Sequence, residues 1–267
     1  MKKIRALMIG AHPDDCEFGT GGLAVLLSEQ GHSVKFVSLT NGETGHFQRS
    51  REETAKIRKS EMEEACKIAN IECKIFDIAS NAIEADIPTR EKVIRLIREY
   101  KPDIIFTHRT NDYHPDHRRT AILVQDSSYA VRVPLVCPET PCLRYSPVIM
   151  YMYDGFAKPV PFTPNIVINI DKIMRKKVKM LDCHISQQYE WIPWIESYEV
   201  PESAGEKFKW LYEQQAKRDS GVADKYRNEL LKRYGESGND VKFAEAFEIS
   251  EYGRNPTEND LQELFPV

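Results

Sequence analysis

The sequence lacks the segments that direct a chain into or across a membrane. Behind two N-terminal lysines the apolar run is interrupted by Arg5 and ends at His12, which is too short for the hydrophobic part of a signal peptide. No apolar run approaches the roughly 20 residues that span a bilayer. These absences predict a soluble, cytoplasmic protein without a transmembrane segment.

The sequence also lacks paired cysteine motifs and clusters of basic residues. The six cysteines form no Cys-x-x-Cys pair, which favours a reducing compartment over a disulfide framework. The net charge is −4 and the basic residues are scattered, so we expect no nucleic-acid partner. With 267 residues, 41% of them hydrophobic, the chain can bury a substantial core, and we predict a single α/β domain over 1–267.

Apolar runs alternate with amphipathic stretches through the first half of the chain. Strands are predicted at 6–9, 34–39, 75–78 and 104–107, and helices at 21–30, 51–70 and 88–100. This alternation is typical of βαβ units, so the predicted fold is α/β with a Rossmann-like, mostly parallel sheet and helices on both faces. Ligands of such sheets gather at the carboxyl ends of the strands.

The second half is less regular. Seven prolines between 133 and 164 predict a loop or a pair of edge strands. A strand is predicted at 166–170, followed by a basic helix at 171–183 with Asp171 as its N-cap. We therefore expect a catalytic core of about 1–187 and an irregular, aromatic-rich C-terminal part of about 188–267.

The first predicted strand leads into a short loop with one imidazole and two carboxylates, His12, Asp14 and Asp15. Adjacent side chains of an extended segment point in opposite directions, so His12 and one Asp can bind a metal while the other Asp stays free for proton transfer. The pattern leaves open which Asp does which. Alternatively, one Asp caps the next helix and His12 has no role. The glycines that follow do not match GxGxxG, which disfavours a dinucleotide site.

A second polar cluster, Asn-Asp-Tyr-His-Pro-Asp-His at 111–117, follows the strand at 104–107. Its two histidines, His114 and His117, suit one metal ligand and one acid or oxyanion-stabilising group. Two ligands from the first loop and one from here would form a three-ligand zinc site that keeps a position open for water. The alternative is a capped surface turn, since His-Pro-Asp also forms turns. We expect His108 to be structural or to lie beside the substrate.

The motifs at 11–15 (Ala-His-Pro-Asp-Asp) and 114–117 (His-Pro-Asp-His) together resemble the PIG-L/LmbE-like family of zinc-dependent sugar de-N-acetylases. Further agreements follow in the same order: Thr-Asn-Gly-Glu-Thr-Gly at 40–45, Arg58 with Glu61 and Ala65, His-Ile-Ser-Gln at 184–187 and, more weakly, Glu-Ala-Phe at 245–247. The resemblance covers roughly 4–187. Cys16 stands where the family usually carries Glu, a departure that concerns the substrate loop rather than metal binding.

The resemblance implies a role for each residue of the two motifs. His12, Asp15 and His117 are the expected ligands of Zn²⁺, or of Fe²⁺ in the cell. Asp14 is the expected general base, and His114 the group that stabilises the oxyanion or protonates the leaving amine. The expected reaction removes the N-acetyl group from an N-acetylglucosamine-type sugar and releases acetate and a free amine.

Substrate contacts are predicted from less specific signals. Glu43 and Arg58 could bind sugar hydroxyls or brace the metal site, with a surface ion pair as the alternative. Further candidate substrate-binding residues are Tyr113, His184 and Trp191, and at least one of Trp191, Trp194 and Tyr189 should line the pocket rim.

Other functions remain compatible with these motifs. They are a metal hydrolase of another amide or ester and a non-catalytic carbohydrate-binding protein. The expected partner is a small N-acetylated sugar, and a homo-oligomer is compatible with the sequence.

Overall fold

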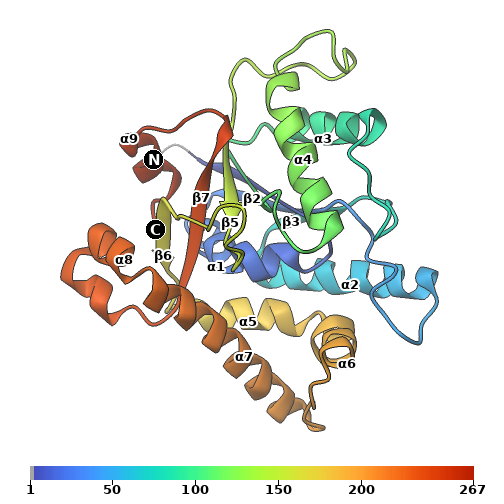
Figure 1. The fold of residues 1–267 in the computed structure, drawn as a ribbon, viewed down its shortest axis with the longest axis vertical. Helices are drawn as coiled ribbons and strands as arrows, with labels where there is room; N and C mark the ends of the chain where they lie inside the picture. The colour runs from blue at the N-terminus through green and yellow to red at the C-terminus, as the bar shows by residue number, and fades with distance from the viewer. Residues whose placement is uncertain (1–2) are drawn as a thin grey trace.

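One seven-stranded sheet between two layers of helices forms the centre of the protein (Figure 1). The computed structural model describes residues 3–267. The strands are β1 (Arg5–Gly10), β2 (Ser33–Ser38), β3 (Glu72–Ile75), β4 (Ile104–Thr107), β5 (Val148–Met152), β6 (Ile166–Asn169) and β7 (Ala244–Gly253). Their order is β3-β2-β1-β4-β5-β7-β6; neighbouring strands from β3 to β5 pair in parallel, and β7 pairs antiparallel with β5 and β6. The predicted α/β fold with a mostly parallel sheet is confirmed.

Strand order reverses beside β1. The chain runs outward from β1 to β2 and β3, then returns to place β4 on the other side of β1. Connections leave the carboxyl ends of β1 and β4 toward opposite faces of the sheet, which opens a crevice between them. The two polar clusters of the sequence follow these two strands.

The helices cover the two faces unequally. One face carries α1 (Asp15–Glu29), α2 (Arg51–Ala69), α5 (Met174–Asp182) and α7 (Ala204–Lys225); the other carries α3 (Ile87–Tyr100) and α4 (Pro115–Ala130). Side chains of β1 alternate between these layers, with Ala6 and Met8 in one core cluster and Leu7 and Ile9 in the other. The remaining helical segments are the π-helix η1 (Ser186–Trp191), α6 (Ile192–Glu196), α8 (Arg227–Tyr234), the 3-10 helix η2 (Gly235–Asp240) and α9 (Glu258–Leu264).

Four predicted elements are wrong in position. Helix α1 begins at Asp15 rather than at residue 21. The third strand is Glu72–Ile75 rather than 75–78, because its residues alternate between exposed and half-buried and form no apolar run. The Pro-rich stretch 133–164 contains β5, which is an interior strand between β4 and β7 and not an edge strand. Pro147 lies immediately before β5, whose five residues include no proline.

Asp171 is the fourth correction. Helix α5 begins at Met174 with Ile173 in the N-cap position and no capping side chain. Asp171 instead accepts hydrogen bonds from the backbone N–H groups of Lys242 (3.0 Å) and Phe243 (2.7 Å), which lead into β7. Its carboxylate therefore joins the turn after β6 to the start of β7.

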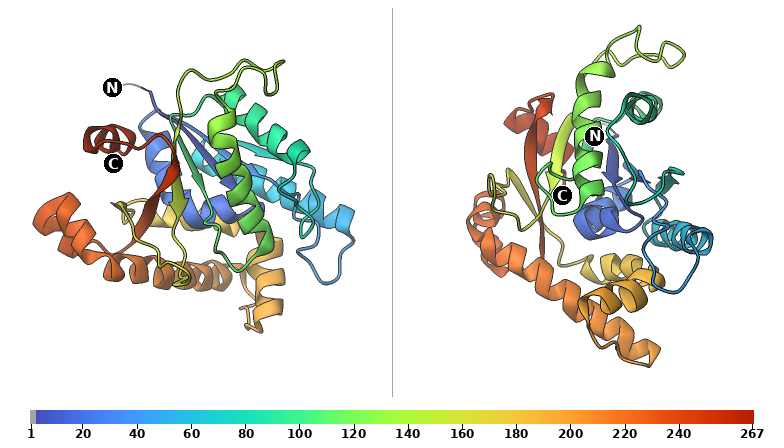
Figure 2. Two further views of the ribbon diagram at one scale, coloured as in Figure 1. Left: turned by 45° about the horizontal axis from the view of Figure 1, so that its top comes forward. Right: turned by 45° about the vertical axis from the view of Figure 1, so that its right-hand side comes forward.

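A buried ion network fastens α7 to the rest of the molecule. Lys177 of α5 contacts Asp219 of α7 at 3.0 Å and Glu245 of β7 at 2.8 Å. Glu245 also accepts hydrogen bonds from the backbone N–H groups of Gly22 and Leu23 in α1. The long helix α7 runs beside α5 in Figures 1 and 2. No helix within residues 3–267 is long and apolar enough to cross a bilayer.

Candidate active site

A pocket of about 470 Å³ opens at the carboxyl ends of the central strands. His12, Asp14 and Asp15 line it from the loop after β1, and His114 and His117 from the loop after β4. The segment that follows β5 supplies part of its wall. The pocket thus lies at the crevice where strand order reverses.

The three predicted metal ligands converge there. His12 Nδ1 lies 3.2 Å from His117 Nε2 and 3.6 Å from Asp15 Oδ2, and His117 Nε2 lies 3.4 Å from Asp15 Oδ1. Ligand atoms about 2.0–2.2 Å from a tetrahedral zinc ion lie about 3.3–3.6 Å from one another. The two imidazoles and one or the other oxygen of the Asp15 carboxylate therefore lie close to the spacing that a four-coordinate divalent cation requires.

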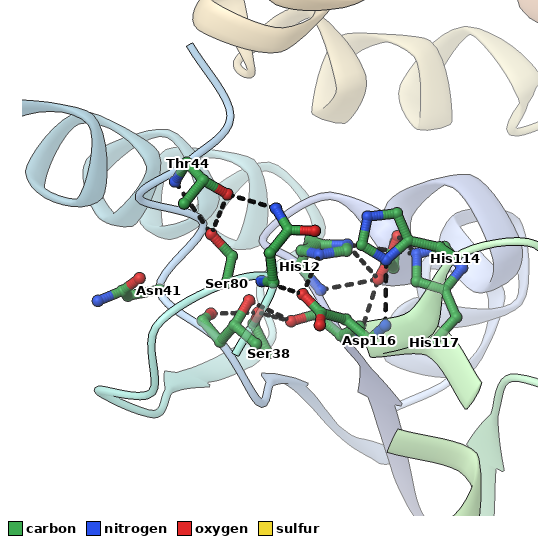
Figure 3. A network of polar contacts seen from close by, with 12 residues as sticks. His12, Ser38, Asn41, Thr44, Ser80, His114, Asp116 and His117 are labelled. Carbon is green, nitrogen blue, oxygen red and sulfur yellow. Dashed lines mark hydrogen bonds and ion pairs between the residues drawn. The ribbon is translucent and has the colours of Figure 1, made fainter. Parts of the chain in front are cut away.

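Carboxylates orient both imidazoles. Asp116 Oδ2 lies 3.1 Å from His12 Nε2, and Asp112 Oδ2 lies 3.0 Å from His117 Nδ1. Figure 3 shows His12, His114 and His117 grouped beside Asp116. A carboxylate on the far nitrogen sets the tautomer and the ring orientation of a metal-binding imidazole. It leaves His12 Nδ1 and His117 Nε2 directed at the point of convergence.

Asp15 is held in place by the backbone. Its Oδ2 accepts hydrogen bonds from the N–H groups of Ala11 (2.8 Å) and His12 (2.7 Å) and lies 3.1 Å from His108 Nε2. Although burial opposes ionisation, the imidazoles of His117 and His108 hold the pKa of Asp15 well below its usual value. The carboxylate is therefore charged and its Oδ1 faces His117.

Two further imidazoles adjoin the predicted ligands. Ligand atoms of His12, His114 and His117 lie within 4.8 Å of one another, as do those of Asp15, His108 and His117. The His108 ring stacks on His117 with centroids 4.0 Å apart. Although burial lowers it, the carboxylates of Asp15 and Asp112 raise the pKa of His117 to about 10. The centre of the site thus attracts positive charge, which a divalent cation would supply in place of a proton.

Asp14 lines the pocket beside that centre and pairs with a buried arginine. Its Oδ2 lies 3.0 Å from Arg58 Nη2, which also donates to the carbonyl oxygen of Pro13 at 2.9 Å. Asp14 precedes α1 but makes no side-chain capping hydrogen bond in the described chain, so the helix-cap alternative is wrong for Asp14. Burial raises the pKa of Asp14 more than the guanidinium of Arg58 lowers it. This carboxyl can therefore exchange a proton.

His114 is the N-cap residue of α4. Its Nδ1 accepts a hydrogen bond from the backbone N–H of Asp116 at 3.2 Å, so the neutral ring carries its proton on Nε2. Burial and the neighbouring imidazoles of His12 and His117 lower the pKa of His114 to about 4. A neutral imidazole that donates from Nε2 suits hydrogen bonding to an oxygen in the pocket.

The predicted substrate residues lie in different surroundings. Arg58 and the exposed Tyr113 line the pocket, whereas Glu43 lies outside the pocket lining found among residues 3–267 and contacts Arg51 at 3.2 Å. His184 is fully buried behind the pocket, with its Nε2 3.1 Å from Glu17 Oε1. The structure therefore brings Arg58 and Tyr113 to the pocket but not Glu43 or His184.

Of the three rim aromatics, Trp191 lines the pocket. Trp194 is half-exposed and stacks between Trp191 and Phe47, at centroid distances of 5.4 and 4.9 Å. Tyr189 packs against the core and donates a hydrogen bond to Asp182. A role of Trp191 in binding stays a prediction.

Besides Trp191, residues of the second half that the sequence did not single out supply part of the pocket wall. Tyr153 and Asp154 follow β5, and Asp154 is held by Arg109 through two contacts of 2.6 and 2.7 Å. Arg218 reaches the pocket from α7. The prolines around β5 concealed the first segment, and no local pattern distinguishes Arg218 from other basic residues of an amphipathic helix.

Comparison with known proteins finds both deacetylases and a hydratase. The 4-oxalmesaconate hydratase of Pseudomonas putida is 25% identical over 70% of this chain and 75% of its own. The diacetylchitobiose deacetylase of Thermococcus kodakarensis is 26% identical over 73% of this chain and 75% of its own. The structure of the N,N'-diacetylchitobiose deacetylase of Pyrococcus horikoshii superposes with a TM-score of 0.71 at 24% identity, covering 92% of this chain and 83% of that one.

The family comparison covers both polar clusters. Residues 7–127 match the PIG-L family model, described as GlcNAc-PI de-N-acetylase. This segment contains His12, Asp14, Asp15, His114 and His117, the residues that meet in the pocket. In sequence and in fold, the chain belongs to the PIG-L/LmbE-like family.

Proposed function

We propose that this protein is a metal-dependent hydrolase that removes the N-acetyl group from an N-acetylglucosamine-type sugar or conjugate. Zn²⁺ is the proposed metal, with Fe²⁺ as the alternative in the cell. The observation that carries the proposal is the convergence of His12 Nδ1, Asp15 and His117 Nε2 at mutual distances of 3.2–3.6 Å beside an uncoordinated Asp14.

The pocket suits an amide of a small sugar. Its volume of about 470 Å³ lies within the range of roughly 300–1,000 Å³ found for small-molecule sites. The similarity to diacetylchitobiose deacetylase supports the same class of substrate. A bound divalent cation would act as a Lewis acid on the acetyl carbonyl and would lower the pKa of water at the site.

Asp14 and His114 have different roles in the proposed reaction. Asp14 takes a proton from the attacking water, because it is buried, lies outside the ligand set and has a raised pKa. His114 donates a hydrogen bond from Nε2 to the carbonyl oxygen as negative charge develops on it. Since the pKa of His114 is about 4, its ring is a hydrogen-bond donor and not a source of protons near pH 7.

The leaving amine needs the proton that the water gives up. Protonated Asp14 delivers it to the amide nitrogen, after which the C–N bond breaks. The hydroxyl of the water has then joined the acetyl carbon, so the products are acetate and the free amine. Arg58 keeps the Asp14 side chain oriented through this exchange by its contact at 3.0 Å.

Acetate release tests the proposal. Protein stripped with a chelator and reloaded with Zn²⁺ or Fe²⁺ should release acetate from methyl N-acetylglucosaminide or diacetylchitobiose, and the stripped protein should not. Asp15→Ala, prepared in parallel, provides the baseline. If neither metal raises acetate release above this baseline for any N-acetylated glucosaminide, the proposed function is wrong.

The similarity to 4-oxalmesaconate hydratase favours a second candidate, the addition of water across a C=C bond of an unsaturated carboxylic acid. Asp14 would again take a proton from the water. The same metal-loaded protein, mixed with conjugated unsaturated dicarboxylates, would remove their ultraviolet absorbance. Loss of absorbance without acetate release from glucosaminides would favour the hydratase.

A further inference from the structure

We propose that the substrate carries an anionic group, a phosphate or a carboxylate, that Arg218 binds on the wall of the pocket formed by α1 and α7. This inference rests on the proposed function and specifies its substrate class. The acetamido group of the substrate must lie over the cluster of His12, Asp15 and His117. The anionic group therefore belongs to a part of the substrate beyond the acetamido group.

The first argument is the pairing of charges around the pocket. Each carboxylate that lines it has a cationic or imidazole partner: Asp14 with Arg58 at 3.0 Å, Asp15 with His117 at 3.4 Å, Asp112 with His117 at 3.0 Å, and Asp154 with Arg109 at 2.6 Å. Arg58 is buried in its own pair. Within the described part of the chain, Arg218 is the arginine of the pocket lining that no carboxylate neutralises at hydrogen-bond distance.

The contacts of Arg218 leave most of its donors available. One nitrogen, Nη1, donates to the carbonyl oxygen of Phe18 at 2.5 Å, and the guanidinium carbon lies 5.8 Å from the centre of the Phe18 ring. The nearest carboxylate oxygen, Asp219 Oδ1, is 3.9 Å away. Asp219 is already bound by Lys177 and by Gln215. A guanidinium has five N–H donors, so several remain for a ligand.

The position of the guanidinium is fixed relative to the proposed metal centre. Phe18 belongs to α1, one helical turn after Asp15. Asp219, the neighbour of Arg218 in α7, is 1% exposed and belongs to the ion network with Lys177 and Glu245. The guanidinium therefore loses little conformational freedom when it binds a ligand, and this makes its hydrogen bonds more favourable.

The chemistry of the side chain selects the ligand. A guanidinium matches the two oxygens of a phosphate or carboxylate, and such charge-assisted hydrogen bonds are roughly twice as strong as neutral ones. The Arg218 side chain is 35% exposed, so it is partly shielded from solvent yet open to the pocket. An anion on the substrate would neutralise it, whereas a sugar hydroxyl would not.

The experiment compares three glycosides of N-acetylglucosamine on the zinc-loaded full chain. They are the 1-phosphate, the carboxymethyl glycoside and the neutral methyl glycoside, and acetate release gives kcat and KM for each. Arg218→Ala should raise KM for at least one anionic glycoside and lower the anionic-to-neutral ratio of kcat/KM by about ten- to a hundredfold. Arg218→Lys should recover part of that ratio.

The control is Lys217→Ala, an exposed neighbour on α7 outside the pocket lining, which should leave the ratio unchanged. The anionic glycoside whose KM rises identifies phosphate or carboxylate as the preferred group. Equal changes for neutral and anionic glycosides in Arg218→Ala, or no change in any of them, would overturn the proposal.

If the proposed function itself is wrong, the acetate assay gives a different result from the one that overturns the role of Arg218. In that case no glycoside releases acetate from the wild-type chain. Calorimetric binding of glucosamine 1-phosphate and carboxymethyl glucosaminide to wild type and Arg218→Ala then decides the anion site separately. Binding that weakens about tenfold or more in Arg218→Ala supports the site, and equal binding rejects it.

Discussion

Replacing Asp14 by asparagine separates proton transfer from metal binding at this site. The two side chains have the same shape, so the asparagine would keep an oxygen that accepts from Arg58 Nη2, now 3.0 Å from the carboxylate. The mutation removes the capacity to take and return a proton. Since the contacts described for Asp14 lead to Arg58 and not to His12 or His117, we expect the zinc content to stay at the wild-type level.

The expected loss in kcat is about 10²–10⁴, the usual contribution of a general base. This corresponds to roughly 2.7–5.5 kcal/mol in the activation free energy, at about 1.36 kcal/mol for each factor of ten. Arg58, which is 3% exposed, loses its counter-charge but keeps a hydrogen-bond acceptor. We therefore expect the free energy of unfolding to fall by about 1–3 kcal/mol, a loss too small to unfold the protein at 25 °C.

The assay measures acetate release from methyl N-acetylglucosaminide with zinc-loaded protein, the metal content by mass spectrometry, and the melting temperature. Asp14→Asn should combine full zinc content with low turnover. If it lost the metal instead, the two adjacent carboxylates would have the opposite roles. A variant that kept more than about a tenth of the wild-type kcat would refute the assignment of Asp14 as the base.

Three further variants test other parts of the structure. Asp15→Ala should lose bound zinc together with activity, because its carboxylate is one of the three converging groups; zinc retained at full stoichiometry would contradict that. Trp191→Ala should raise KM about two- to tenfold at unchanged zinc content. The control is Tyr198→Ala, because Tyr198 is exposed and lies outside the pocket lining of the described residues, and its KM should stay at the wild-type value. Equal KM values for the two variants would exclude Trp191 from substrate binding. Glu245→Ala leaves Lys177 with one fewer counter-charge in a buried network. The free energy of unfolding should therefore fall by about 3–5 kcal/mol and the melting temperature by roughly 5–9 °C. A fall of less than about 1 kcal/mol would show that the network is not needed for stability.

Local patterns in the sequence predicted most of the first half of the fold. Strands β1, β2 and β4 are short apolar runs between amphipathic helices, and their predicted positions lie within a residue or two of those observed. Strand β3 was displaced by three residues because a strand at the edge of a sheet has no apolar run to mark it. Strand β5 was hidden by the prolines on either side of it.

The candidate site could also be predicted only in part from the sequence. The loops after β1 and β4 could be paired from the sequence, because parallel strands deliver their carboxyl ends to one edge of the sheet. The orientations of the side chains in these loops could not be predicted from the sequence. Only the folded chain shows that Asp112 and Asp116 hold the imidazoles of His117 and His12, and that Asp14 turns toward Arg58.

The sequence by itself determined the α/β class, the two polar loops and the residue types that can bind a metal, since these follow from periodicity and from local chemistry. The sequence already pointed to Trp191, but tertiary structure alone decided that Tyr153, Asp154 and Arg218 also reach the pocket. Arg218 lies about 200 positions after Phe18, the residue it contacts, and α7 is fastened there through Lys177, which lies 42 positions before its partner Asp219. Long-range packing of this kind depends on the burial of charges and apolar faces between separate elements, and no local pattern of residues records it.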